Sequence, residues 1–212
     1  MLDLGVGTGR TAYTFAALTR SYVGIDFAPR MIELAREMVE EDERTAFEVG
    51  DARDLSRFHG RDLDLVLFSF NGIDNVDHDD RLKVLHEIRR VLAADGVFAF
   101  SCHSLASLPF AVDFRLSMLK GFRSGYAHVR RSVRTVIVNR GLDLEAALER
   151  GWLMIRDDSG LVQYYVAPRE QLRQLDATGF DVDRVLDGAG HVVDPEQPGR
   201  DPHLFYICRP RS

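Results

Sequence analysis

This 212-residue sequence has only two cysteines, no long apolar run and no excess of basic residues. The two cysteines, Cys102 and Cys208, stand in apolar runs and lack a CxxC partner, so we expect buried free thiols and neither a disulfide nor a metal site. No stretch approaches the ~18 apolar residues that cross a bilayer, and the first residues do not resemble a signal peptide. Lys and Arg total 27 against 33 Asp and Glu, a net charge of −6 that argues against general nucleic-acid binding. We therefore expect a cytoplasmic protein without a membrane partner.

The remaining composition is that of a folded chain, with 45% hydrophobic, 28% charged and 9% aromatic residues. Apolar runs alternate with helical patterns from the first residue, which predicts an α/β fold with a parallel sheet covered on both faces. Strands are expected at 1–4, 22–25, 46–49, 63–70 and 96–102, and helices at 11–20, 29–41 and 80–92. Gly96, after Ala93-Ala94-Asp95, is expected in a left-handed turn that ends the third helix.

The alternation stops between residues 104 and 166. A partly helical stretch there is followed by a predicted β-hairpin of 151–156 and 161–166, joined by a turn at 157–160. A helix over 168–178 and strands over 180–186 and 204–208 complete the chain. We interpret 1–212 as a single domain, in which 104–166 is a helical and β-hairpin insert after the fifth strand and covers the substrate as a lid.

A glycine-rich loop, Gly5-Val6-Gly7-Thr8-Gly9, follows the first predicted strand and precedes the first predicted helix. Glycines let the backbone turn sharply and approach a ligand closely, so a nucleotide-like ligand is expected there. The dinucleotide fingerprint GxGxxG would need glycine at position 10, where the chain has Arg10, which argues against a nicotinamide oxidoreductase. An isolated loop of this kind is equally compatible with an ordinary tight turn.

Carboxylates stand at the ends of the first three predicted strands. Asp3 lies two residues before the first glycine, Asp26 ends the second strand, and Asp51 follows the third. A carboxylate at the position of Asp26 can accept hydrogen bonds from both ribose hydroxyls, and Asp51 can meet an adenine amino group. Either residue can instead be an ordinary turn residue.

These motifs, in this order, resemble the class I S-adenosylmethionine-dependent methyltransferases over residues 1 to about 100. Residues 91–96 also resemble the family's turn before the fifth strand. The resemblance implies a Rossmann-like, doubly wound, mostly parallel seven-stranded sheet whose last strand is antiparallel, and S-adenosyl-L-methionine as the cofactor. The cofactor-binding residues that it implies are Asp3, Gly5, Gly7, Gly9, Asp26, Phe27, Asp51, Ala52 and Phe70. Because this sequence begins inside the first strand, we expect the family's N-terminal covering helices to be absent from it. Either the start is misplaced or clipped, or the insert or another chain covers the cofactor.

The methyl acceptor is expected at the carboxyl ends of the fourth and fifth strands, because ligands of open parallel sheets bind at that edge. Asn71 and His103 are the polar candidates for catalysis there, and His103 can serve as a general base if the acceptor is protonated. A histidine at a strand end is also commonly a hydrogen-bonded structural residue. Asp74, Asp77, His78, Asp79 and Asp80 resemble a metal cluster, but a loop and a helix N-terminus account for them better.

The predicted insert is strongly basic, with seven Lys or Arg and no Asp or Glu between residues 115 and 140. This segment is either a solvated helix face or a cap that attracts an anionic substrate. Trp152, Tyr164 and Tyr165 are either apolar walls of that site or ordinary hairpin packing. The sequence thus predicts a methyltransferase acting on a small molecule, with an anionic acceptor as the finer hypothesis. The alternatives are a nucleic-acid or protein methyltransferase and a non-catalytic cofactor-binding protein.

Overall fold

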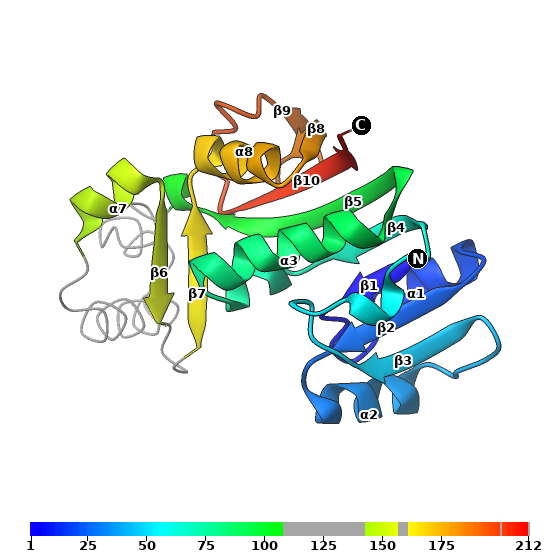
Figure 1. Cartoon of the computed structure of the whole chain (residues 1–212). Helices are drawn as coiled ribbons and strands as arrows, with labels where there is room; N and C mark the ends of the chain where they lie inside the picture. Colours follow the sequence, from blue (N-terminus) through cyan, green and yellow to red (C-terminus); the bar gives the residue numbers. More distant parts are fainter. Residues whose placement is uncertain (108–142, 157–160, 200, 212) are drawn as a thin grey trace.

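The computed structural model describes residues 1–107, 143–156, 161–199 and 201–211 (Figure 1). Its strands are β1 (Leu2–Leu4), β2 (Tyr22–Asp26), β3 (Thr45–Val49), β4 (Leu63–Phe68), β5 (Leu92–Ser104), β6 (Trp152–Arg156), β7 (Val162–Val166), β8 (Phe180–Leu186), β9 (Val192–Val193) and β10 (His203–Pro210). Its helices are α1 (Ala12–Phe15), α2 (Pro29–Met38), α3 (His78–Val91), α7 (Leu144–Arg150) and α8 (Pro168–Ala177). Short 3-10 turns are η1 (Ala16–Leu18), η2 (Ser56–Phe58), η3 (Gly72–Asn75) and η4 (Leu105–Ser107).

The strands form one sheet in the order β3-β2-β1-β4-β5-β10-β8-β9. Strands β1 to β5 pair in parallel, whereas β10 runs antiparallel to both β5 and β8. The predicted mostly parallel sheet with an antiparallel last strand is therefore confirmed. The described residues also contain the predicted hairpin, β6–β7, which joins the sheet where β7 pairs with β5, and a short strand β9 that was not predicted.

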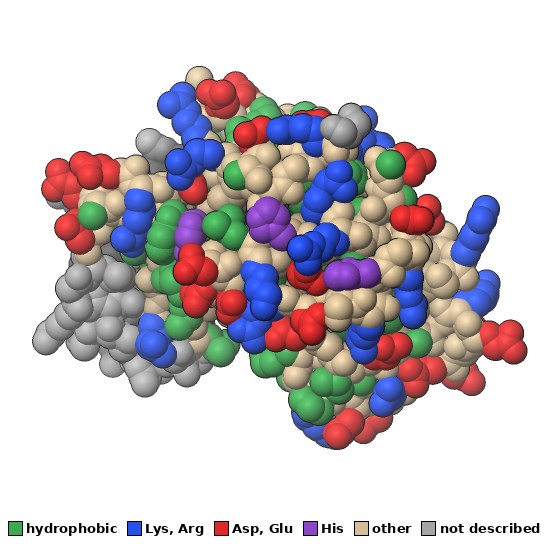
Figure 2. Space-filling model, in the orientation of Figure 1, with side chains coloured by type: hydrophobic (Ala, Val, Ile, Leu, Met, Phe, Trp, Pro, Cys, Tyr) green, Lys and Arg blue, Asp and Glu red, His purple; other side chains and the backbone are tan. Residues whose placement is uncertain are grey.

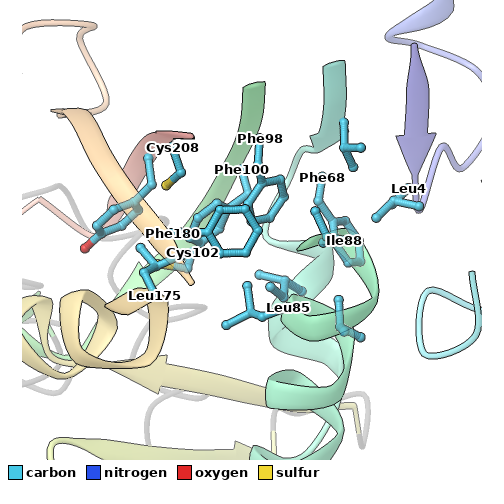
Figure 3. Close-up of a cluster of buried hydrophobic side chains, with 14 of the residues drawn as sticks. Leu4, Phe68, Leu85, Ile88, Phe98, Phe100, Cys102, Leu175, Phe180 and Cys208 are labelled. Atoms are coloured by element: carbon cyan, nitrogen blue, oxygen red, sulfur yellow. The ribbon is translucent and has the colours of Figure 1, made fainter. Parts of the chain in front are cut away.

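Helices cover both faces of this sheet. The side chains of β4 alternate, with Leu65 and Leu67 packing against a cluster that includes residues of α1 and α2, and Val66 and Phe68 packing with α3. Figure 3 shows the cluster that contains Val66 and Phe68. In it, Leu85 and Ile88 of α3 and Leu175 of α8 contact aromatic side chains of the sheet. This two-sided burial fixes the carboxyl ends of the parallel strands as a rigid edge.

The prediction of a left-handed turn at Gly96 is wrong. Strand β5 follows α3 directly at Leu92, and its pairing with β4 jumps from Leu63↔Leu92 to Leu65↔Val97, so residues 93–96 form a bulge. Gly96 does not adopt a positive φ. A Cβ atom at this position would lie 2.7 Å from the Leu63 carbonyl oxygen, so glycine is required because the two backbones approach closely.

Other predicted elements are present, and some of their ends differ from the predicted ones. The first helix is shorter than expected, since α1 gives way to the 3-10 turn η1, and α2 ends at Met38. The hairpin is confirmed within one residue of its predicted bounds. The turn at 157–160 and the basic segment 115–140 lie outside the described residues. No helix in the described ranges is long and apolar enough to cross a membrane.

Both cysteines are buried and free, as predicted. Cys102 of β5 and Cys208 of β10 belong to the cluster drawn in Figure 3. Burial raises the pKa of each thiol well above its usual value. Both side chains therefore act as small apolar groups at neutral pH.

Candidate functional site

A cavity of about 420 Å³ opens at the carboxyl ends of the parallel strands. Of the residues expected to bind the cofactor, those that line it are Gly5, Asp26, Phe27, Asp51, Ala52 and Phe70. Asp3, Gly7 and Gly9 are not among the lining residues. The cavity thus joins the glycine loop to the ends of β2, β3 and β4.

The glycine loop adopts a conformation that only glycine tolerates well. Gly5, Gly7 and Gly9 have φ values of 62°, 56° and 84°, in the left-handed region. A Cβ on Gly5 would also lie 2.9 Å from the ring of Phe68. The loop therefore turns sharply after β1 and packs onto the end of β4, beside the cavity.

Asp26 connects this loop to the start of α2. Its Oδ2 accepts a hydrogen bond from the Gly7 amide at 3.0 Å, and its Oδ1 accepts one from the Ala28 amide at 2.9 Å. This second bond holds the chain just before α2, whose N-cap residue Ala28 provides no side-chain cap. An ionised carboxylate has about four lone-pair sites, so Asp26 can still accept from a ligand. Its contact with a ribose stays a prediction.

Asp3 lies beneath the loop and is fully buried. Its Oδ2 accepts hydrogen bonds from the hydroxyl groups of Thr11 and Tyr22, the latter at 2.5 Å. Burial is the main reason that the pKa of Asp3 rises to about 6, and these hydrogen bonds oppose that rise. Its Oδ1 has no hydrogen-bond partner in the described part of the chain. The role of Asp3 in binding the cofactor stays a prediction.

Asp51 faces the cavity but is held by an arginine that sequence reasoning missed. The Arg53 guanidinium donates to Asp51 at 2.7 Å and to Asp80 at 2.6 Å, and all three side chains line the cavity. The hydrogen bond from Arg53 is the largest reason that the pKa of Asp51 lies below its usual value. An adenine amino group would share Asp51 with this guanidinium. The local sequence Asp51-Ala52-Arg53 was the available signal, but Asp80 comes from α3.

A strained turn follows β4. Phe70 and Asn71 both have left-handed backbones, with φ values of 54° and 56°. The backbone N–H of Asn71 donates to Ser101 Oγ of β5 at 2.9 Å, and this bond ties the turn to that strand. The exposed ring of Phe70 has the Arg10 guanidinium 3.1 Å above its centre. Residues in such conformations persist where surrounding contacts hold them, which is common at ligand sites.

The two expected catalytic residues meet at this turn. Asn71 Nδ2 lies 3.3 Å from His103 Nε2 and 2.8 Å from His203 Nδ1. The other ring nitrogen of His103, Nδ1, lies 2.8 Å from Asp74 Oδ2. Asp74 in turn forms a fully buried ion pair with Arg81 at 2.6 Å. His203 was missed because β10 brings it from 132 residues away, which no local pattern signals.

The acidic group after β4 mostly marks the start of α3, as expected. Asp77 caps this helix by accepting from the Asp80 amide at 2.8 Å, and Asp79 also lies in the first turn. Asp74 instead belongs to η3 and pairs with Arg81. The group is therefore built from helix-capping and ion-pair contacts.

The aromatic residues of the hairpin lie in two places, and their role as apolar walls of a substrate site stays a prediction. His78 stacks on Trp152 at 4.5 Å, and its Nδ1 lies 2.7 Å from the Tyr164 hydroxyl. These contacts pack the hairpin against α3. Tyr165 lies beside the polar cluster, with its ring centre 4.9 Å from that of His103.

Comparison with known proteins agrees with this geometry. Residues 1–96 match a family model described as a methyltransferase domain. A ubiquinone/menaquinone biosynthesis C-methyltransferase from Citrifermentans bemidjiense is 38% identical over 119 residues, which are 53% of this chain and 49% of that protein. The chain thus spans about half the length of such a relative. Over this part the chain is similar to methyltransferases, the class that its motifs resemble.

Solved structures show the same fold at low sequence identity. The CcbJ methyltransferase from Streptomyces caelestis superposes with a TM-score of 0.64 at 16% identity, covering 100% of this chain and 83% of that one. A 1,6-didemethyltoxoflavin-N1-methyltransferase from Burkholderia thailandensis, solved with its substrate and S-adenosylhomocysteine, gives a TM-score of 0.57 at 18% identity. This match covers 100% of this chain and 70% of the other. The predicted Rossmann-like class is therefore confirmed.

Proposed function

We propose that this chain is an S-adenosylmethionine-dependent methyltransferase that acts on a small molecule. The cofactor occupies the cavity between the glycine loop and the ends of β2, β3 and β4. The observation that carries this proposal is the left-handed loop of Gly5, Gly7 and Gly9, tied through Gly7 to Asp26 beside that cavity. The quinone-pathway relative and the toxoflavin-precursor enzyme, both named for small-molecule substrates, support the acceptor class.

The donor methyl group then faces the turn after β4. Asn71 and His103 lie at the ends of β4 and β5, next to the lining residue Phe70. Methyl transfer from a sulfonium needs the acceptor and the methyl carbon in line, and such positioning can supply up to ~7–11 kcal/mol of the barrier. The edge of the sheet provides this alignment because the cofactor region and the acceptor region lie on neighbouring strands.

The finer hypothesis of an anionic acceptor rests on the basic segment 115–140, which lies outside the described residues. A nucleic-acid or protein acceptor remains the alternative proposal. On the face drawn in Figure 2, basic and acidic side chains are interspersed among the described residues, a pattern that favours a small-molecule acceptor over a phosphate backbone. A non-catalytic cofactor-binding protein would share the cavity but would not need the polar cluster of Asn71 and His103.

Calorimetry with S-adenosylhomocysteine tests the proposal. We expect one molecule to bind per chain and to raise the melting temperature, because a ligand that binds only the folded state stabilises it by mass action. NADH serves as the control ligand, since the loop lacks the dinucleotide spacing. Binding of NADH in the absence of any heat from S-adenosylhomocysteine would overturn the proposed function.

A further inference from the structure

One end of the cavity, between the residues after β3 and the start of α3, combines an apolar lining with a charged edge. Ile25, Ala52 and Val84 line the cavity and pack in one cluster of apolar side chains. Asp51 and Arg53 line it as well and supply the charged edge. An apolar pocket with a few polar groups suits a flat heteroaromatic ring, which buries its faces and presents its edge to those groups.

The charged edge contains hydrogen-bond acceptors and donors side by side. Arg53 donates to Asp51 from Nε at 3.0 Å and from Nη2 at 2.7 Å. It also donates from Nη1 to Asp80 Oδ2 of α3 at 2.6 Å. A guanidinium group has five N–H hydrogens, and these contacts use the one on Nε and one on each terminal nitrogen. Among the described residues, the second hydrogens on Nη1 and Nη2 have no protein partner, so a ligand in the cavity can accept them.

Arg53 is held from both sides of this end of the cavity. Asp51 follows β3, whereas Asp80 lies in the first turn of α3, so the guanidinium links these two elements. The hydrogen bond with Asp51, and after it the one with Asp80, raises the pKa of Arg53, so the side chain stays charged. A carboxylate alone only accepts hydrogen bonds and would repel a carbonyl oxygen of a ligand. The adjoining guanidinium supplies the donors that a carbonyl oxygen needs.

We propose that Arg53 sets the base specificity of the cofactor site, and that this site binds a 6-oxopurine as well as adenine. The inference rests on the proposed function, with the base of the cofactor placed at Asp51. The 6-amino group of adenine then donates to Asp51, and an adjacent ring nitrogen accepts a free hydrogen of Arg53. In a 6-oxopurine the N1–H group donates to Asp51, and the 6-oxo oxygen accepts from Arg53. The same pair of side chains therefore satisfies both base edges.

Calorimetry on the full chain tests this assignment with S-adenosylhomocysteine and S-inosylhomocysteine, whose bases are adenine and hypoxanthine. In the wild type we expect the two dissociation constants to lie within about tenfold of each other, because each base edge keeps its partners. Arg53→Met keeps the length of the side chain but removes its donors. This variant should weaken S-inosylhomocysteine about ten- to a hundredfold more than it weakens S-adenosylhomocysteine, because only the 6-oxo oxygen is then left facing a carboxylate.

Two further variants separate recognition of the base from a structural role. Arg53→Lys keeps a charged donor, so it should retain part of the affinity for S-inosylhomocysteine that Arg53→Met loses. The matched control is Arg211→Met, which should leave both dissociation constants unchanged. Arg211 also pairs with two aspartates and its side chain is 43% exposed, against 42% for Arg53, but it does not line the cavity.

Asp80 is a positioning residue in this proposal, because it holds Arg53 from α3. Asp80→Asn should weaken S-inosylhomocysteine by about three- to tenfold, and adding it to Arg53→Met should cause no further selective loss, since both changes remove the same interaction. The control is Asp79→Asn, an exposed neighbour in the same helical turn that does not line the cavity.

Two results would overturn the inference. One is S-inosylhomocysteine that binds the wild type more than about tenfold more weakly than S-adenosylhomocysteine. The other is an equal loss of both ligands in Arg53→Met, which would show that Arg53 only maintains the shape of the cavity. In either case, binding of S-adenosylhomocysteine to the wild type leaves the proposed function intact. A wild-type chain that binds neither ligand would remove the proposed function and the inference together.

Discussion

Asp3 and Asp26 are both carboxylates at the ends of neighbouring strands, but they differ in what they contact. Asp26 accepts from two backbone amides and lines the cavity, so it joins the loop to the ligand site. Asp3 is fully buried and accepts from the hydroxyls of Thr11 and Tyr22. The same side chain therefore makes different contacts at the two strand ends, with hydroxyl groups beneath the surface in one case and with backbone amides beside the cavity in the other.

Replacing Asp26 by alanine should weaken S-adenosylhomocysteine binding by roughly 1.5–3 kcal/mol, or about ten- to a hundredfold in Kd, through lost charge-assisted hydrogen bonds. Calorimetry measures this, with Glu37→Ala on the exposed side of α2 as the control. A dissociation constant that stays the same would mean that the ribose is held elsewhere.

The buried carboxyl of Asp3 should make stability depend on pH. Its pKa rises from 3.8 to about 6 in the folded chain, so the folded state binds more protons than the unfolded state between these values. Its favourable contribution is complete below pH 3.8 and is lost as pH rises through about 6.

We therefore expect Asp3→Asn, which mimics the protonated group, to gain stability relative to the wild type as pH rises from 4 to 7, by on the order of 3 kcal/mol. Urea unfolding at several pH values measures this difference. The control is Asp183→Asn, at an exposed ion pair with Arg209. A pH-independent difference between Asp3→Asn and the wild type would contradict the assigned titration.

At the scale of elements, one ring joins the glycine loop to the turn after β4. Phe68, the last residue of β4, packs between Gly5 and Gly72, where added Cβ atoms would lie 2.9 and 2.3 Å from the ring. The ring also lines the cavity. Both glycines are therefore needed for the loop and η3 to pack closely against Phe68.

Gly72→Ala should displace the Phe68 ring, since the added methyl group has no space. We expect a stability loss of about 1–3 kcal/mol, typical of an overpacked core, together with weaker S-adenosylhomocysteine binding. Thermal melting and calorimetry measure the two effects. The double variant with Phe68→Leu frees space and should recover part of the stability, and equal stability of all three proteins would show that the ring is not confined.

At the scale of the whole molecule, the strand order places the cavity and the polar cluster of Asn71, His103 and His203 at the same edge of the sheet. The cavity lies at the carboxyl ends of β1 to β4 and is also lined by η3 and α3, and the polar cluster lies where β4, β5 and β10 meet. Strand β10 lies between β5 and β8, so a residue near the carboxyl end of the chain faces Asn71. The β6–β7 hairpin contacts the same edge through the pairing of Tyr165 with His103.

The sequence alone determined the α/β class, the glycine loop and the residues at the strand ends, because hydrophobic period and glycine spacing are local properties. It also indicated Asn71 and His103, since residues after buried strands gather at one edge of a parallel sheet. Only the tertiary structure decided that His203 joins them, that Arg53 links Asp51 to Asp80, and that Gly96 lies in a bulge. These features depend on contacts between residues far apart in the chain, and such contacts form only when the strand order and the packing of α3 are fixed.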